Sequence, residues 1–306
     1  MIHGILNVYK EKGYTSHDVV AKLRGITGQK KIGHTGTLDP DAEGVLPVCL
    51  GKATKLCDML TDKDKTYEAV LLLGKVTDTQ DISGTVLETR NVDKIDERSV
   101  RGAIEAFVGP YEQVPPMYSA LKVNGRKLYE LAREGKEVER KARTVQVYGI
   151  DILSVLLPRV SIRVHCSKGT YIRTLCHDIG ERLSCGGCME TLIRTRAGRF
   201  SQETSLTLSE IEERYRAGHL PEILIPVDAM FEEYPGLKVK KEWDSMAKNG
   251  NPLPRKAVEA VRQTAASCGN SEYVRIYDKE GRFVSVSRWQ EDEKEYHIVK
   301  MFYVPE

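Results

Sequence analysis

The sequence lacks the features that mark membrane-spanning and exported proteins. No apolar run approaches the ~20 residues that a bilayer-crossing helix needs. The N-terminus, Met1 to Lys10, does not show the basic and then apolar layout of a secretory signal. We therefore expect a folded protein that is made and kept in the cytoplasm, without a membrane partner.

Cysteine spacing shows neither a disulfide framework nor a metal-ligand pattern. The seven cysteines are odd in number and irregularly placed, as expected for reduced thiols. Cys185 and Cys188 form a CxxC pair, but no second pair accompanies it at a spacing that suits zinc. We interpret this pair as part of a glycine-rich turn. The sequence also contains no P-loop, no GxGxxG motif and no internal repeat.

Net charge is small, yet basic residues are concentrated in the middle of the chain. The 306 residues carry a formal charge of only +2, and 41% of them are hydrophobic, which is typical of a protein with a packed core. Residues 122–143 contain eight Lys or Arg against four Glu, and residues 159–199 contain eight against three acids. This distribution indicates one positive face suited to nucleic acid, although a solvated helix surface has the same composition.

Hydrophobic periodicity and turn signals predict helices and strands in irregular order. Thr15 and Asp18 form a capping-box pattern before a helix that ends at Gly28, and residues 30–47 have no clear period and are interpreted as a loop. Residues 114–143, here called the basic arm, open with two prolines and resemble an insertion. Further strands are expected at 5–8, 67–73, 145–155 and 160–166, helices at 100–108, 170–183 and 206–216, and a hairpin-rich β module after about residue 235.

The loop from Gly33 to Pro47 has the most unusual composition in the chain. Three glycines and two prolines fix an irregular backbone that is costly to order, which suggests that it positions side chains for a purpose. Asp39 lies inside it, and a lone loop aspartate is more often a turn former. Asp39, Asp41 and Glu43 also suggest a metal site, but a proline interrupts them and no fourth oxygen ligand is nearby, so we expect no metal.

Residues 33–55 closely resemble the signature of the TruB family of tRNA pseudouridine synthases. Their sequence is GHTGTLDPDAEGVLPVCLGKATK. Four further blocks appear in the family's order, and the resemblance spans about residues 5–230. These blocks are Lys65-Thr66-Tyr67, Val114-Pro115-Pro116-Met117-Tyr118-Ser119-Ala120, Cys166-Ser167-Lys168-Gly169-Thr170-Tyr171-Ile172-Arg173 and Thr191-Leu192-Ile193-Arg194-Thr195.

The resemblance implies an α+β fold, with a large mixed and mostly antiparallel sheet flanked by helices. Residues 1–234 would form the catalytic domain, with the basic arm inserted, and residues 235–306 a small PUA-like RNA-binding module. The implied activity is conversion of uridine 55 in the T arm of tRNA to pseudouridine. The implied partner is the T stem-loop of tRNA, bound by a monomer with no cofactor and no obligate protein partner.

The resemblance also implies roles for single residues. Asp39 would be the catalytic residue, and Arg173 would pair with its carboxylate. The remaining positions would contact substrate: Tyr67 against the target base, Leu192 at the pocket, His34 where the nucleotide leaves the stack, Tyr171 on the same side as Arg173 if that segment is extended, and Lys10. The family commonly has Lys-Pro near its first strand, whereas this chain has Lys10-Glu11.

These residue types suit the implied reaction. Breaking the glycosidic bond builds positive character on the ribose. An ionised carboxylate can stabilise this charge, attack the sugar carbon, or remove a neighbouring proton. It can alternatively add to the pyrimidine ring. An adjacent guanidinium is expected to lower the pKa of Asp39. The base must leave its stack, and the basic arm, mobile without RNA, would supply phosphate contacts.

Three other functions fit parts of the sequence. A non-catalytic tRNA-binding or tRNA-folding protein would use the basic arm and the β module but would need no carboxylate facing RNA. A nucleoside or glycoside hydrolase would use Asp39 with Asp41 or Glu43. A synthase working inside a guide-RNA particle would keep the chemistry with additional proteins, but the compact chain and short tail favour an enzyme that acts alone.

Overall fold

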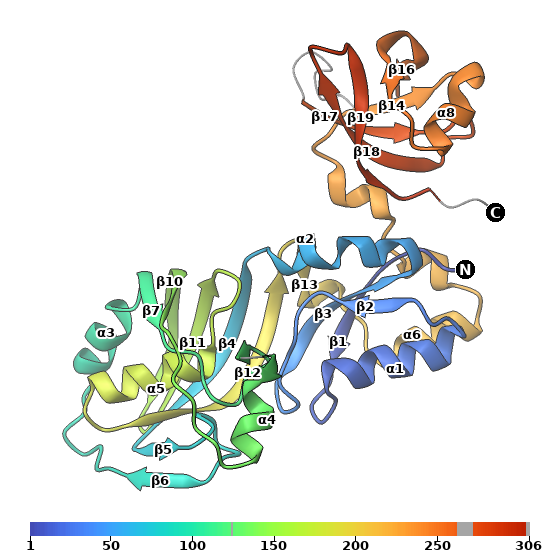
Figure 1. Ribbon diagram of the computed structural model, residues 1–306. Helices are drawn as coiled ribbons and strands as arrows, with labels where there is room; N and C mark the ends of the chain where they lie inside the picture. Colours follow the sequence, from blue (N-terminus) through green and yellow to red (C-terminus); the bar gives the residue numbers. More distant parts are fainter. Residues whose placement is uncertain (124, 262–271, 304–306) are drawn as a thin grey trace.

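The computed structural model describes residues 1–123, 125–261 and 272–303. The chain has the predicted α+β fold, with a large mixed sheet and a smaller β module at one end (Figure 1). No helix in the described ranges is long and apolar enough to cross a membrane. The seventh cysteine, Cys268, lies outside them.

The elements of the large sheet and its surroundings come first in the chain. They are β1 (Gly4–Lys10), α1 (Ser16–Thr27), β2 (Ile32–His34), β3 (Glu43–Leu50), η1 (Gly51–Leu56), α2 (Cys57–Thr61), β4 (Lys65–Leu73), β5 (Lys75–Thr77), β6 (Val86–Thr89), α3 (Glu97–Glu105), β7 (Gly109–Gln113), β8 (Lys122–Val123), β9 (Arg126–Lys127), α4 (Leu128–Arg133), β10 (Arg143–Leu156), β11 (Arg159–Cys166), α5 (Ile172–Arg182), β12 (Gly187–Ala197), β13 (Phe200–Ser201), η2 (Gln202–Thr204), α6 (Leu208–Arg216), α7 (Leu220–Ile223) and η3 (Val227–Phe231).

The β module follows with its own elements. They are β14 (Gly236–Val239), η4 (Lys241–Trp243), α8 (Asp244–Lys248), β15 (Leu253–Pro254), η5 (Arg255–Ala257), β16 (Val258–Ala260), β17 (Tyr273–Tyr277), β18 (Phe283–Gln290) and β19 (Glu295–Met301). Its strands pair in the order β15-β19-β18-β17-β14-β16.

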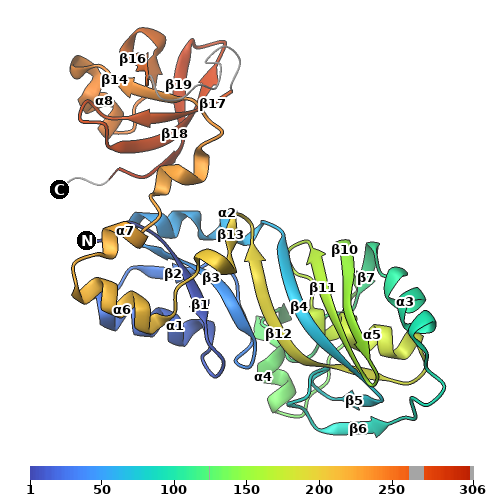
Figure 2. The same cartoon turned by 180° about the vertical axis from the view of Figure 1, so that it is seen from behind.

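The large sheet follows the strand order β1-β3-β12-β4-β11-β10-β7, and its neighbours are antiparallel except where β12 runs parallel to β3. At that junction Arg194 lies opposite Gly44. β12 therefore joins the N-terminal strands to the rest of the sheet, at its centre (Figure 2).

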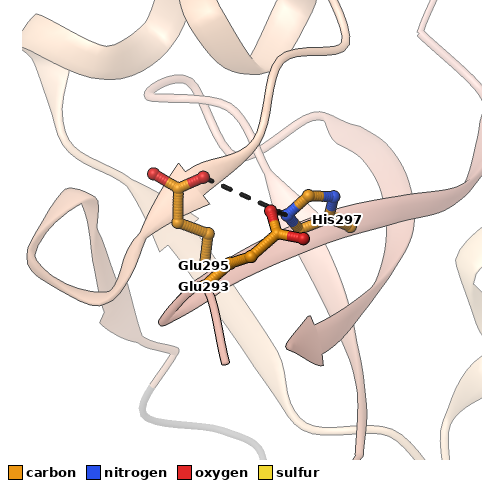
Figure 3. Close-up of side chains that lie close together, drawn as sticks. All are labelled: Glu293, Glu295 and His297. Atoms are coloured by element: carbon orange, nitrogen blue, oxygen red, sulfur yellow. Dashed lines mark ion pairs between the residues drawn. The ribbon is translucent and has the colours of Figure 1, made fainter. Parts of the chain in front are cut away.

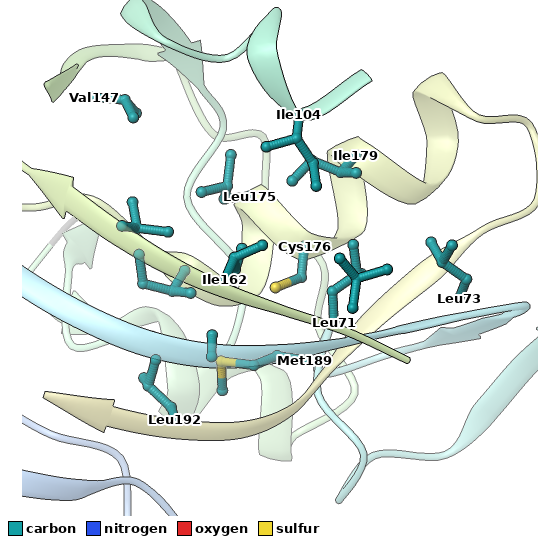
Figure 4. Packing of buried hydrophobic residues seen from close by; sticks show 14 of the residues in the cluster. Leu71, Leu73, Ile104, Val147, Ile162, Leu175, Cys176, Ile179, Met189 and Leu192 are labelled. Atoms are coloured by element: carbon teal, nitrogen blue, oxygen red, sulfur yellow. The ribbon is translucent and has the colours of Figure 1, made fainter. Parts of the chain in front are cut away.

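The alternation of buried and exposed side chains along the strands explains how the helices pack on the sheet. In β11, Val160, Ile162, Val164 and Cys166 are buried while the residues between them are more exposed, as the period-two pattern predicts. The buried set packs against α5 through Leu175, Cys176 and Ile179, and against α3 through Ile104 (Figure 4). On the β1–β3 side, a separate cluster packs α1 and α6 against the sheet.

The β module has its own core but shares a second one with the large sheet. Leu237, Val239 and Ile276 belong to a cluster inside the module. Val286 and Phe302, in contrast, pack in one cluster with buried residues of β1 and β3. Apolar contact of this kind fixes the module against the N-terminal strands, beside α2 (Figure 1).

The predicted loop at 30–47 is wrong at both ends, since it contains β2 and most of β3, and only residues 35–42 are irregular. All of β3 after Glu43 is buried, so the strand has no alternation for a period-two search to detect, and Pro47 argues against a strand. Similarly, the helix predicted at 100–108 ends at Glu105, and Gly109 begins β7. Tertiary pairing decided both cases.

Gly180 tests the close packing of α5 on β12. A Cβ at this helical position would lie 2.2 Å from the backbone nitrogen of Gly187, whereas one at Gly25, exposed in α1, would meet nothing within 4 Å. We expect Gly180→Ala to lower the free energy of unfolding by about 1–3 kcal/mol, because the backbones must separate. Gly25→Ala should raise it by ~0.5–1 kcal/mol through helix propensity. Urea unfolding of both variants measures the contrast, and equal effects would contradict this packing.

Candidate active site

Asp39 begins a tight turn between β2 and β3. The backbone N–H of Ala42 donates to the Asp39 carbonyl at 3.1 Å, and Pro40 occupies the second turn position, where its fixed φ is favoured. Asp39 is thus a turn former, as its loop position suggests. Its carboxyl group nevertheless points to a specific partner elsewhere in the fold.

The residues on either side of Asp39 are anchored. Leu38 is buried, and its N–H donates to Ser16 Oγ, at the start of α1, at 2.9 Å. The Pro40 carbonyl accepts from Gly13 N at 2.9 Å and from Lys10 Nζ at 3.1 Å. The backbone is therefore held on both sides of Asp39, while its side chain keeps 41% of its surface exposed.

Arg173, in the first turn of α5, is the partner of Asp39. Its Nε lies 2.9 Å from Asp39 Oδ2, and its side chain is only 5% exposed. The same guanidinium donates to the Thr79 carbonyl at 3.0 Å and to the Tyr118 carbonyl at 2.8 Å, and lies 3.8 Å from Asp81. The structure thus brings together the two residues that the resemblance pairs, and adds Asp81 to them.

The pKa of Asp39 shifts in the opposite direction from the one that the sequence predicts. Burial is the largest influence and raises this pKa above its ordinary value, and the carboxylate of Asp81 raises it further. Arg173 does act downward, as predicted, but does not overcome the loss of hydration. The prediction considered one neighbour, whereas the net shift depends on all of the surrounding protein.

Lys10 lies beside the Asp39 turn, and its predicted contact with substrate stays a prediction. Its side chain is fully buried, and its ammonium donates to the carbonyls of Tyr14, Pro40 and Glu11 at 2.6, 3.1 and 3.2 Å. Burial lowers its pKa to about 8, although Glu43 and Asp39 oppose the shift. Lys10 therefore anchors the backbone of the Asp39 turn through its hydrogen bond to the Pro40 carbonyl.

Tyr67 and Leu192 lie on neighbouring strands, β4 and β12, and contribute to the same hydrophobic cluster as Leu38. Burial raises the pKa of Tyr67, and the Asp39 carboxylate is among the charges that raise it further. This places both side chains, with Leu38, in the apolar surroundings of the Asp39 turn.

Tyr171 and His34 lie at the edges of this group. Tyr171 is the residue before α5, and burial raises its pKa, with Arg173 and Asp39 among its charged neighbours. Because α5 begins at Ile172, Arg173 is helical, and the extended segment that would align the two side chains is absent. The His34 ring packs edge-on against His17, with 5.3 Å between centroids.

Sequence reasoning missed two residues of the site. Asp81 lies in the turn between β5 and β6, and Arg194 lies within a block of the resemblance but received no role. Arg194 is 1% exposed, donates from Nε to the Val45 carbonyl at 2.7 Å, and leaves Nη2 without a hydrogen bond. Gly44 is required here, since a Cβ would lie 2.3 Å from the Arg194 carbonyl. Only its block membership could have indicated Arg194, and Asp81 lies in none of the blocks.

Two groups of side chains in the described ranges could hold a metal ion, and both lie in the β module. One comprises Glu293, Glu295 and His297, with His297 2.9 Å from Glu293 (Figure 3). The other comprises Asp244, Asp278 and Glu280, which form ion pairs with Lys248, and Arg282 also pairs with Asp278 and Glu280. Neither includes the Asp39 loop.

Two cavities lie away from Asp39. One of about 620 Å³ is lined by residues of β1, the segment after β13, and α7, and the other, of about 320 Å³, lies beside the turn between β4 and β5. Leu6, Phe200 and Leu206 are among the apolar residues that line the first cavity. Neither cavity is lined by Asp39 or Arg173.

Comparison with known proteins shows the class of this fold and site. Residues 24–172 match the family described as TruB family pseudouridylate synthase (N terminal domain), and residues 173–232 match tRNA pseudouridylate synthase B C-terminal domain. Two solved structures share the fold over 98% of this chain and 85% of theirs. They are a Cbf5-Nop10-Gar1 complex, with TM-score 0.70 and 28% identity, and an H/ACA RNP bound to a substrate RNA containing 2'-deoxyuridine, with TM-score 0.69 and 26% identity.

The fold and the paired carboxylate therefore define an enzyme of the pseudouridine synthase class. A protein named tRNA pseudouridine synthase B from Lachnoclostridium phytofermentans is 54% identical over 309 residues, covering 98% of this chain and 100% of the relative. This chain belongs to the TruB family of pseudouridine synthases.

Replacing Lys10 tests its buried charge. Below pH 8 the ammonium is protonated in both folded and unfolded chains, and its burial penalises the folded state. Between about pH 8 and pH 10.5, the ordinary pKa of a lysine, the unfolded chain binds more protons than the folded chain. The free energy of unfolding therefore rises with pH in this range. The wild type should gain roughly 3 kcal/mol over Lys10→Met across this window.

Urea unfolding at several pH values measures the difference. Lys12→Met, at an exposed neighbouring position, is the control and should show a difference from wild type that does not change with pH. A pH-independent difference for Lys10→Met would contradict the buried ammonium.

Proposed function

We propose that this enzyme converts uridine 55 in the T arm of tRNA to pseudouridine, with Asp39 as the catalytic residue. The 2.9 Å ion pair between Asp39 and Arg173 carries the proposal. It orients a partly exposed carboxylate through a guanidinium that is itself almost fully buried. An oriented anion of this kind suits a reaction that builds positive charge on a sugar carbon.

The proposed reaction is an isomerisation, so its atoms balance without a second substrate. The bond from the sugar carbon C1′ to N1 of uracil breaks, the base turns, and a bond from C1′ to C5 forms. C5 loses a proton and N1 gains one. Attack of the carboxylate on C1′, removal of the neighbouring proton and addition to the ring all require ionised Asp39. No external group is transferred, and we propose that no cofactor or metal is used.

The detached base must turn without escaping. Tyr67 is proposed to lie against one face of the base and Leu192 to close the pocket beside it, since both belong to the apolar cluster around Leu38. His34 and Tyr171, at the edges of the site, are proposed to contact RNA near the everted nucleotide.

The basic arm and the β module are proposed to hold the RNA. In the arm, Lys122, Arg126 and Lys141 are exposed and suited to phosphate contacts. The arm root lies at the site, because the Tyr118 carbonyl binds Arg173. A similarly folded structure is described as bound to a substrate RNA. We propose that residues 1–234 form the catalytic domain and residues 235–306 a PUA-like RNA-binding module.

The enzyme is proposed to act as a monomer without an obligate protein partner. Asp39, Arg173, Tyr67 and Leu192 all come from this one chain, so the site needs no residue from another subunit. A role confined to RNA binding is the alternative. The carboxylate, oriented by a buried cation, favours catalysis because binding of an anionic RNA gains nothing from a carboxylate.

Asp39→Asn should abolish turnover while preserving tRNA affinity, because the amide keeps the shape but cannot act as an anion. We expect a loss of at least about a thousandfold, of the size seen when a residue that acts on the reacting atoms is removed. Pseudouridine mapping on an unmodified tRNA transcript and a binding titration measure the two quantities. Asp41→Asn, at the exposed position two residues later, is the control and should remain active. An active Asp39→Asn enzyme would refute the proposed role.

The acid limb of the activity profile reports the pKa of Asp39. Since burial and Asp81 raise this pKa, activity should fall, as pH decreases, at a higher pH than an ordinary aspartate would give. Asp81→Asn removes one raising influence, so the limb should move to lower pH. Turnover should also fall, because Arg173 loses a neighbour. A limb that moves to higher pH in Asp81→Asn would contradict this electrostatic arrangement.

A further inference from the structure

Gln113 makes two hydrogen bonds to a single residue near the site. It is the last residue of β7, its side chain is 1% exposed, and the basic arm begins immediately after it. Its Oε1 accepts from the Tyr171 N–H at 2.8 Å, and its Nε2 donates to the Tyr171 carbonyl at 2.9 Å. One amide therefore binds both backbone polar groups of Tyr171. Movement of either residue relative to the other would break these two hydrogen bonds.

The start of α5 depends on this contact because the helix lacks a cap of its own. Tyr171 is the N-cap residue, and its side chain makes no capping hydrogen bond. Its carbonyl accepts the first helical bond, from Leu175 N at 3.1 Å, and also receives Gln113 Nε2. Arg173 follows two residues later, so Gln113 fixes the backbone from which the guanidinium extends.

The same segment also contacts Arg173 directly. The Tyr118 carbonyl, five residues beyond Gln113, accepts from Arg173 Nη2 at 2.8 Å. Residues 113–118 therefore contribute three hydrogen bonds to residues 171–173, one of them to the guanidinium itself. The root of the arm and the start of α5 form one hydrogen-bonded unit behind Asp39.

We propose that Gln113 is a positioning residue for the reaction: through the backbone of Tyr171 it sets where Arg173 meets Asp39, and thereby connects the root of the basic arm to the catalytic ion pair. The inference rests on the proposed role of Asp39. The amide is the required group, because a shorter side chain cannot reach both Tyr171 atoms and an isosteric apolar one cannot bond to either.

The test uses Gln113→Met, which keeps the length but removes both bonds, and Gln113→Asn, which keeps the amide but shortens it. Both should lower kcat, on the order of a hundredfold for the Met variant, because a displacement of about 1 Å at reacting groups has effects of this size. KM for tRNA should stay unchanged. The acid limb of kcat should move to higher pH, since a displaced Arg173 lowers the pKa of Asp39 less.

A purely structural role predicts a different result. It would lower the melting temperature while leaving kcat per folded molecule and the acid limb unchanged, and that outcome overturns the proposal. Glu112→Gln, at the exposed neighbouring position, is the matched control and should match wild type. If the Met variant does not fold, the same three measurements on Gln113→Asn decide the question.

A double-mutant cycle separates this inference from the proposed function. In an Arg173→Lys background, Gln113→Met should reduce kcat by a much smaller factor than in wild type, because the group that it positions has already changed. Equal factors in the two backgrounds overturn the positioning role. Asp39→Asn is assayed alongside: if it is active, both proposals fall, and if it is inactive while Gln113→Met behaves as wild type, only the positioning role falls.

Discussion

The structure of the site depends on the buried guanidinium of Arg173. An arginine offers five N–H donors in a rigid plane, and burying it is unfavourable unless those donors are satisfied. Here they reach Asp39, the Thr79 carbonyl and the Tyr118 carbonyl, with Asp81 nearby. Three irregular segments, far apart in sequence, are therefore tied together at one point, and the Asp39 loop is one of them.

Charge in the site is divided between an open anion and buried cations. Asp39 keeps 41% of its side chain exposed, while Lys10 and Arg194 are buried. Burial lowers the pKa of Lys10 to about 8. These two cations bind the Pro40 and Val45 carbonyls within residues 33–47, and the Asp39 carboxylate stays partly exposed.

The two family matches divide the large sheet in a way that the fold does not. The boundary between them falls at residue 173, yet β12, which follows it, lies between β3 and β4 at the centre of the sheet. Asp39 belongs to the first match and Arg173 to the second, so the ion pair forms only when both halves fold together. The β module lies beyond both matches and packs on β1 and β3 through Val286 and Phe302.

The sequence by itself determined the features that depend on local pattern. The capping box of Thr15 and Asp18, the alternation of β11 and the irregular turn around Asp39 are each written in a few consecutive residues, because helix caps, strand faces and proline turns are local constraints. Only the tertiary structure decided that β3 is a strand, that Lys10 is buried, and that the pKa of Asp39 rises. Pairing, burial and hydration are sums over residues as far apart as 39 and 173, and no local stretch of sequence contains them.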